Sequence, residues 1–145
     1  MTKYVSENMN RFNYLTSEID AAYHDAALKF GLSDSAMMIL YAVCCNGDSC
    51  LISDIIYLSG TSKQTVNSAL RKLEADNVVY LEAVNGRKKR VCLTDKGRAL
   101  AEHTVVRLIE IENSIFASWS EQEQEMYLAL IQRYLNSFRE KIKEV

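Results

Sequence analysis

Proline is absent from this chain of 145 residues, and that absence constrains the fold more than any other feature. Average usage would give about seven prolines at this length. Glycine is also scarce, with five residues in all. Because proline and glycine interrupt regular elements, their scarcity favours long helices over a many-turned β sandwich. The length suits one domain, and a hydrophobic content of 48% is enough to form a core.

Apolar residues recur at steps of three and four along most of the chain, which predicts helices. We expect them over residues 4–30, after Ser33, and over 52–59, 63–76, 97–118 and 121–143. Side-chain caps are predicted at Ser33, Ser62 and Thr94, and a capping box at Ser120 with Glu123. Asn77 stands where a left-handed residue is expected to end its helix, since asparagine tolerates that conformation.

Two β-rich runs, 78–81 and 91–93, flank the pair Asn85-Gly86. Such a pair is a strong signal for a two-residue hairpin turn, and this turn would place Glu82 opposite Lys89. Two short helices joined by a glycine turn and followed by a basic hairpin are typical of a winged helix-turn-helix. The expected fold class is therefore mainly α with a small β-hairpin wing, plus a helical dimerisation region.

Charge is unevenly distributed along the chain. Residues 61–90 hold seven of the 17 basic and three of the 19 acidic side chains, so this segment carries +4 in a chain of net charge −2. A basic segment on an acidic body can bind a polyanion locally while the body stays soluble. No Asp or Glu occurs between residues 62 and 73, which a merely solvated helix face does not explain.

The predicted outward face of helix 63–76 carries side chains of the kinds that contact base edges and phosphates. The basic residues after the hairpin turn suit the negative potential of a narrow minor groove. The candidate DNA-binding residues are Ser62, Lys63, Gln64, Thr65, Asn67, Ser68, Arg71, Lys72, Arg87 and Lys88.

The stretch from Ile55 to Gly97 resembles the MarR family of bacterial transcription regulators. Ser62-Lys63-Gln64-Thr65-Val66, with Leu70 and Leu73-Glu74, is similar to that family's recognition helix. Asn85-Gly86-Arg87 followed by Val91-Cys92-Leu93-Thr94-Asp95-Lys96-Gly97 resembles its wing signature, D-x-R-x-x-x-V-x-L-T-x-x-G. Asn85 replaces the usual Asp, Asn77 replaces a helix-ending Gly, and the wing is shorter than the common pattern.

The resemblance implies a single MarR-like domain over residues 1–145. Its DNA-binding part would be 33–94, and residues 1–32 and 95–145 would form dimerisation helices. The three long amphipathic helices outside 33–94 support this independently, because their apolar stripes need a partner. The function implied is that of a homodimeric regulator, expected to be a repressor, that binds a pseudo-palindromic double-stranded operator.

A small aromatic or lipophilic effector is the trigger that the resemblance implies. Such effectors commonly bind between the dimerisation helices and the DNA-binding part. The residues that could line such a cleft are Tyr14, Tyr23, His24, Met37, Met38 and Tyr41. The same side chains would equally suit a plain core.

Two alternatives remain open at this stage. In one, the repressor senses oxidants through Cys44 and Cys45, although no basic residue lies near them in sequence to lower a thiol pKa. In the other, the chain is a protein-interaction module that has lost DNA binding, as the substituted wing Asp and the acidic body would allow.

Enzymatic motifs are absent from the sequence: it has no glycine-rich phosphate loop, no GxSxG and no HExxH. The cysteine and histidine spacing matches no zinc pattern, so we expect neither a catalytic function nor a cofactor or metal. No apolar run approaches the about 18 residues that a membrane span needs. The N-terminal segment also has no apolar signal core, and the expected location is the cytoplasm.

Overall fold

Serine and threonine caps set the start of most helices in the computed structural model, which describes residues 4–145. In each capped helix the side chain of the preceding residue accepts a hydrogen bond from a backbone amide of the first turn, and Ser120 and Glu123 form the complete capping box. The capped helices, each named with its cap, are α1 (Glu7–Phe30, Ser6), α2 (Asp34–Cys45, Ser33), α4 (Lys63–Ala75, Ser62), α5 (Asp95–His103, Thr94) and α7 (Glu121–Ile142, Ser120). The caps predicted from sequence at Ser33, Ser62, Thr94 and Ser120 are thus confirmed.

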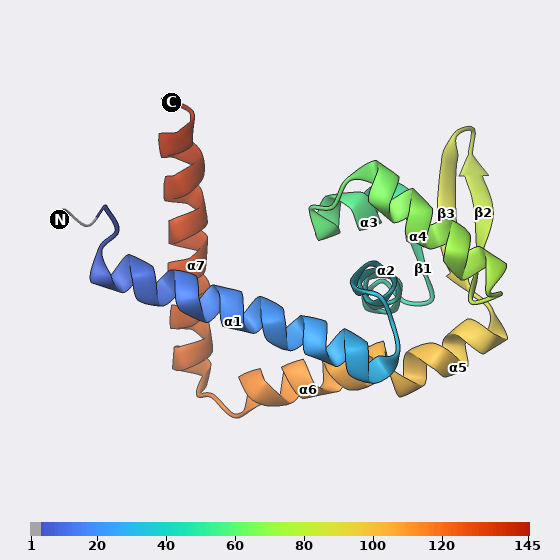
Figure 1. The fold of residues 1–145 in the computed structure, drawn as a ribbon, viewed down its shortest axis with the longest axis horizontal. Coiled ribbons are helices and arrows are strands. Elements are labelled where there is room, and N and C mark those ends of the chain that lie inside the picture. The colour runs from blue at the N-terminus through green and yellow to red at the C-terminus, as the bar shows by residue number, and fades with distance from the viewer. Residues whose placement is uncertain (1–3) are drawn as a thin grey trace. The chain divides into compact units, whose positions relative to one another are not determined.

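The chain divides into two compact units, one ending at Leu108 and one formed by Ile109–Val145. In the first unit α2 lies among α1, α4, α5 and α3 (Ile52–Ser59), as Figure 1 shows. Its apolar residues meet buried residues from all the neighbouring elements. The fully buried large side chains are Ile39, Leu40 and Val43 of α2, with Ile55, Val66, Val91 and Val105.

A three-stranded antiparallel sheet completes the first unit, in the order β1 (Ser49–Leu51), β3 (Lys88–Leu93), β2 (Val79–Asn85). Strand β1 was not predicted, because three residues are too short to show a period of two. It forms by pairing Cys50 with Val91, and both side chains are buried. Strands β2 and β3 make the hairpin beside α4 (Figure 1).

The turn of this hairpin differs from the prediction. Asn85 stays in β2 and pairs with Lys88, so the connecting residues are Gly86 and Arg87. Gly86 has φ +56° and Arg87 has no positive φ, which suits a turn with glycine in its first central position. A register shift between Ala83 and Asn85 places Glu82 opposite Arg90, and the expected Glu82–Lys89 pair is wrong. An extra residue in a bulge explains the shift.

The predicted continuous helix over 97–118 is also wrong. It is divided at Thr104 (φ −128°, ψ −90°) into α5 and α6 (Val105–Ala117). The Thr104 side chain is buried, and its hydroxyl donates to the carbonyl of Leu100 over 2.7 Å. A hydroxyl that bonds the preceding turn competes with the helical pattern and favours such a break.

The second unit holds the end of α6 and helix α7. Phe116, Trp119 and Tyr127 form an aromatic cluster, with Trp119 and Tyr127 edge-to-face at a centroid distance of 5.3 Å. Gln124 Nε2 donates to the carbonyl of Phe116 over 2.7 Å. Helix α7 has no buried residue within the chain, and its apolar stripe is exposed at Leu128, Ile131, Tyr134, Leu135, Phe138 and Ile142.

Within residues 4–145 no single helix is long and apolar enough to cross a membrane. Taken together, α1 and α2 are long and apolar enough, but they are bent by 91° where they meet.

Candidate nucleic-acid interface

Helices α3 and α4 form the helix-turn-helix. Gly60 ends α3 in the left-handed conformation (φ +64°), and its amide donates to the carbonyl of Ile56. Two residues later Ser62 caps α4, and its hydroxyl lies 2.9 Å from Thr65 Oγ1. A glycine in this turn permits the sharp change of direction at no steric cost.

Helix α4 is strongly two-sided. Val66, Leu70 and Leu73 are buried against the core. The polar residues lie on the outside, as the sequence predicts, and none of the first-turn residues is acidic. The exposed candidates are Ser62, Lys63, Gln64, Thr65, Ser68, Arg71 and Lys72, and Asn67 is half-buried. This surface can approach a major groove without presenting a carboxylate to it.

A groove of about 470 Å³ separates α4 from the wing. Lys63 and Asn67 of α4 line one side, and Arg87, Lys88 and Lys89 of the wing line the other. Apolar contacts from Ile52 and Ile56 of α3 form the rest of the lining, together with Ser53. Lys63 and the wing residues 24 to 26 positions later therefore present four cations to one groove.

These four cations have no acidic partner in the described part of the chain. The salt bridges found there join His24 to Asp34, Arg98 to Asp48 and Lys143 to Glu140. The groove cations thus keep their full charge for an external anion. Sequence reasoning missed Lys89, Ile52, Ser53 and Ile56. The run of basic residues 87–90 could have indicated Lys89, whereas the α3 residues need the fold.

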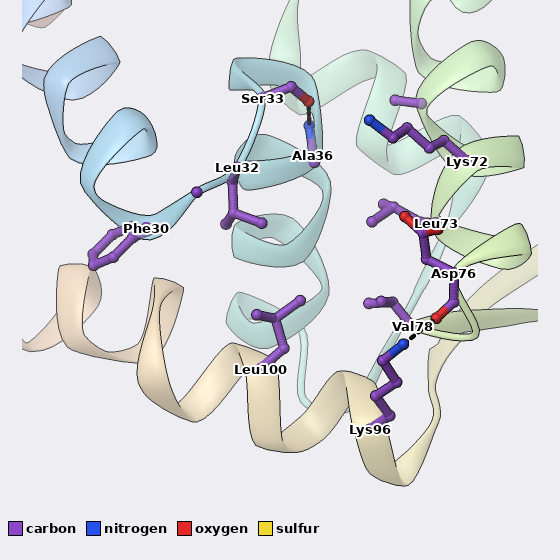
Figure 2. Close-up of a pocket in the computed structure, with 12 residues that line it drawn as sticks. Phe30, Leu32, Ser33, Ala36, Lys72, Leu73, Asp76, Val78, Lys96 and Leu100 are labelled. Carbon is purple, nitrogen blue, oxygen red and sulfur yellow. Dashed lines mark hydrogen bonds between the residues drawn. The ribbon is translucent and has the colours of Figure 1, made fainter.

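Arg71 and Lys72 do not line this groove, and each borders a different hollow. Arg71 lies with Asn67 and Glu74 around a second hollow, and its Nε donates to the carbonyl of Asn67 over 3.4 Å. Lys72 lines a cavity at the start of α2, beside Ser33 (Figure 2). The structure thus brings Lys63, Asn67, Arg87 and Lys88 together at the groove. Gln64, Thr65, Ser68 and Lys72 are exposed on α4 outside the groove lining.

The six suggested effector residues have different settings. Met37 is a core residue, Tyr41 packs against the core, and Thr61 Oγ1 lies 3.6 Å from the sulfur of Met38. Tyr14 and Tyr23 are exposed on α1, and His24 Nδ1 lies 2.9 Å from both carboxylate oxygens of Asp34. An effector cleft formed by these residues stays a prediction.

Three of the four cysteine side chains lie in surroundings that disfavour the thiolate. Burial raises the thiol pKa of Cys44, Cys50 and Cys92. Cys45 is exposed at the end of α2. Because the thiolate is the reactive form, a raised pKa slows oxidation of the three thiols. No group of three or more His, Cys, Asp or Glu side chains suited to a metal ion occurs among residues 4–145.

The MarR family model matches residues 30–90, which span the helix-turn-helix and most of the wing. No curated protein matches the chain. Solved structures do match the chain. Among them is a MarR family regulator from Neisseria meningitidis, with 18% identity, a TM-score of 0.82, and coverage of 96% of this chain and 99% of that one.

Two further solved structures are of proteins that bind DNA. One is MepR of Staphylococcus aureus in complex with DNA, with 22% identity, a TM-score of 0.68, and coverage of 95% of this chain and 99% of that one. The other is BpsR of Bordetella bronchiseptica, whose DNA binding is regulated by 6-hydroxynicotinic acid, with 21% identity, a TM-score of 0.63, and coverage of 86% and 98%. At these identities the structural likeness shows a shared fold, and the family match covers residues 30–90 alone. Residues 30–90 of the chain are thus similar to the MarR family, and the fold is the winged helix-turn-helix of these solved structures.

Proposed function

We propose that the chain is a sequence-specific transcriptional repressor that binds a pseudo-palindromic operator as a homodimer. The observation that carries this proposal is the groove between α4 and the wing. It gathers Lys63, Arg87, Lys88 and Lys89, none of them neutralised by a described carboxylate. Phosphate contacts from such cations fix the register of a protein on DNA, and α4 then presents Gln64 and Ser68 to base edges.

The homodimer is supported by apolar surface that the single chain leaves exposed. Leu128, Ile131 and Phe138 of α7 are about half exposed or more, at 56%, 46% and 54%. Contiguous apolar stripes of this kind mark interaction sites in soluble proteins. Two copies would place two recognition helices on half-sites about 10 base pairs, or a multiple of one turn, apart.

Release by a small-molecule effector is the third part of the proposal. It is supported by the likeness to BpsR, whose DNA binding responds to 6-hydroxynicotinic acid. Cysteine oxidation is the weaker trigger, since burial raises the pKa of three of the four thiols. A location in the cytoplasm follows from the role.

Equilibrium binding to genomic fragments, followed by fluorescence anisotropy across a salt series, tests the DNA proposal. We expect selection of a pseudo-palindrome, and a slope of log affinity against log salt of about −0.9 for each phosphate contact. Lys88→Ala should weaken binding to every fragment, whereas Lys29→Ala, at the end of α1, is a control that should not. Binding that is absent at low salt, or equal for the two variants, would contradict the proposal and favour a protein-interaction module.

A further inference from the structure

The groove between α4 and the wing has an apolar floor, although its rim is cationic. Ile52 and Ile56 of α3 form this floor, and both side chains are half-buried and pack against the core. They lie four positions apart on one helix, so they form a continuous apolar strip on one face of it. Lys63 borders the strip from α4, and residues 87–89 border it from the wing. Contacts with phosphates explain the cations but not the two isoleucines.

A strand of duplex DNA has the alternation of charged and apolar groups that this groove matches. One sugar-phosphate strand separates each major groove of a duplex from the neighbouring minor groove. With α4 in the major groove and the wing at the minor groove, as the repressor role proposed above requires, that strand crosses the groove between them. Along it anionic phosphates alternate with deoxyribose rings, whose 2′ carbon carries only hydrogen. The phosphates then meet the cationic rim, and a deoxyribose ring meets the floor.

We propose that Ile52 and Ile56 bind the deoxyribose of one operator nucleotide in each half-site and thereby exclude a ribose at that position. A 2′-hydroxyl against the isoleucines would lose its water partners and gain no hydrogen bond from them, which disfavours its burial. The 2′-hydroxyl is the group by which proteins distinguish RNA from DNA at a given site. The narrow major groove of an RNA duplex already excludes a helix such as α4. The floor extends this exclusion to a single ribonucleotide within B-form DNA.

Two polar side chains in the groove lining have other roles in this arrangement. Ser53 is exposed on α3, and Asn67 is half-buried on α4. Ser53 follows Ile52 directly, which places it about 100° around the helix, to the side of the apolar strip. Its hydroxyl is therefore assigned to a phosphate, and the amide of Asn67 to a base edge. Ser53→Ala should then weaken binding to operators with and without a ribonucleotide by the same factor.

Fluorescence anisotropy with the full chain and operators that carry one ribonucleotide, moved through each position in turn, tests the site. The measured quantity is the ratio of the Kd for each such operator to the Kd for the all-deoxy operator. We expect a ratio of about five at the same position of each half-site, as suits a hydroxyl that loses water in a partly open groove. A 2′-fluoro nucleotide there should weaken binding much less, because it shifts the sugar pucker as a ribose does but carries no hydroxyl.

Two nearly isosteric substitutions of one floor residue test its role. Ile56→Val keeps the floor apolar and should keep the ratio, whereas Ile56→Thr offers the ribose hydroxyl a hydrogen-bond partner and should bring the ratio toward one. Each ratio compares two DNAs bound by the same protein, so partial unfolding of a variant cannot imitate this result. Leu58→Thr adds the same hydroxyl to exposed α3 surface outside the groove lining and should leave the ratio unchanged.

Four results would overturn the deoxyribose site: no position that is sensitive to a ribonucleotide, an equal loss with the 2′-fluoro nucleotide, equal ratios in Ile56→Val and Ile56→Thr, or a changed ratio in Ser53→Ala. A chain that binds its operator and gives one of these results keeps the repressor role and loses the deoxyribose site. A chain that binds no DNA at low salt loses both.

Discussion

Gly97 allows the start of α5 to pack directly against the backbone at the start of β2, because glycine has no Cβ. A Cβ at this position would meet the backbone oxygen of Val78 closer than real Cβ atoms approach. That oxygen accepts a hydrogen bond from the amide of Thr94 over 3.1 Å, and Thr94 Oγ1 in turn accepts from the amide of Gly97 over 2.9 Å. The start of β2 and the start of α5 are therefore packed backbone to backbone.

Gly97→Ala should destabilise the protein although alanine is the better helix former. Helix propensity alone would favour the substitution by about 1 kcal/mol. The backbone shift forced by the new Cβ should outweigh it, with a net cost of about 1–3 kcal/mol. Urea unfolding measures the difference, and Ala99→Gly on exposed α5 surface gives the propensity scale. If Gly97→Ala instead stabilises the protein, the backbone at Val78 can move away from the new Cβ at little cost.

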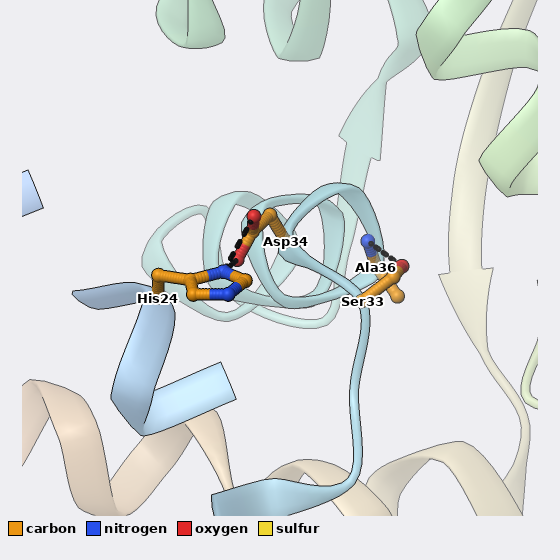
Figure 3. Close-up of polar contacts among 4 residues, drawn as sticks. All are labelled: His24, Ser33, Asp34 and Ala36. Carbon is orange, nitrogen blue, oxygen red and sulfur yellow. Dashed lines mark hydrogen bonds and ion pairs between the residues drawn. The ribbon is translucent and has the colours of Figure 1, made fainter. Parts of the chain in front are cut away.

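His24 Nδ1 makes a bifurcated contact with both carboxylate oxygens of Asp34, which joins α1 to the first residue of α2 (Figure 3). The hydrogen bond to Asp34, followed by its charge, raises the pKa of His24 above 6.5. The pair stabilises the fold fully below the unfolded-state value and loses this contribution as pH rises through the raised pKa. The side chains are 56% and 63% exposed, so the contribution is small.

Replacing Asp34 by Asn should return the pKa of His24 toward 6.5. A nuclear magnetic resonance titration of the imidazole carbons measures this shift directly. The stability lost in Asp34→Asn should shrink as pH rises from about 6.5, because the neutral imidazole no longer attracts the carboxylate. In a His24→Gln background the same substitution should show no such pH dependence. An unchanged His24 titration in Asp34→Asn would contradict the pair in solution.

Elements set by local chemistry are the ones that sequence alone predicts here. The caps at Ser33, Ser62, Thr94 and Ser120 are each a short-range hydrogen bond, and all are found. Asn77 ends its helix segment with φ +59°, as expected of asparagine there. Strand β1 depends on a partner about 40 residues later, and the break at Thr104 depends on burial, so neither shows in a periodic pattern.

In the candidate interface, too, the sequence predicts what depends on local pattern and misses what depends on the fold. The face of α4 follows from a period of 3.6, whereas the meeting of Lys63 and Asn67 with Lys89 needs the hairpin register. The hairpin was the weakest prediction because one bulged residue moves every later pair. Lys72 is exposed on α4, as its place on the predicted polar face implies, and it also borders the cavity at the start of α2, which needs the fold to be seen.

The recognition helix and the wing should fail in different ways when altered. Gln64→Ala should cost about 1–3 kcal/mol on the preferred operator and relax the preference at one position, as loss of a base contact does. Arg87→Ala should weaken binding to all sequences and reduce the salt slope by about one unit. Anisotropy with operator and scrambled DNA across a salt series separates the two. An unaltered slope for Arg87→Ala would show that the wing does not reach DNA.

At the scale of the whole molecule, the exposed stripe of α7 predicts self-association. Ile131→Glu places a charge in the middle of the stripe and should convert a dimer into species of 16.5 kDa. Ala129→Glu adds the same charge on the opposite side of the helix and should leave the dimer intact. Sedimentation velocity at micromolar concentration distinguishes the outcomes. Wild-type protein sedimenting as a monomer would contradict the dimer.

The wing also carries an aggregation hazard that its charges offset. Strand β1 pairs with β3 only at Arg90, Val91 and Cys92, so one edge of β3 beyond that point has no strand beside it in the described chain. Lys88 and Lys89 occupy this open edge, and lysines and bulges are the means by which natural sheets prevent edge-to-edge pairing. Removing several wing cations together would thus leave the open edge of β3 free to pair with another chain, and it would also weaken binding to a polyanion. The wing cations should therefore be replaced one at a time, and light scattering should be measured with each binding curve. Aggregation is then not mistaken for a loss of affinity.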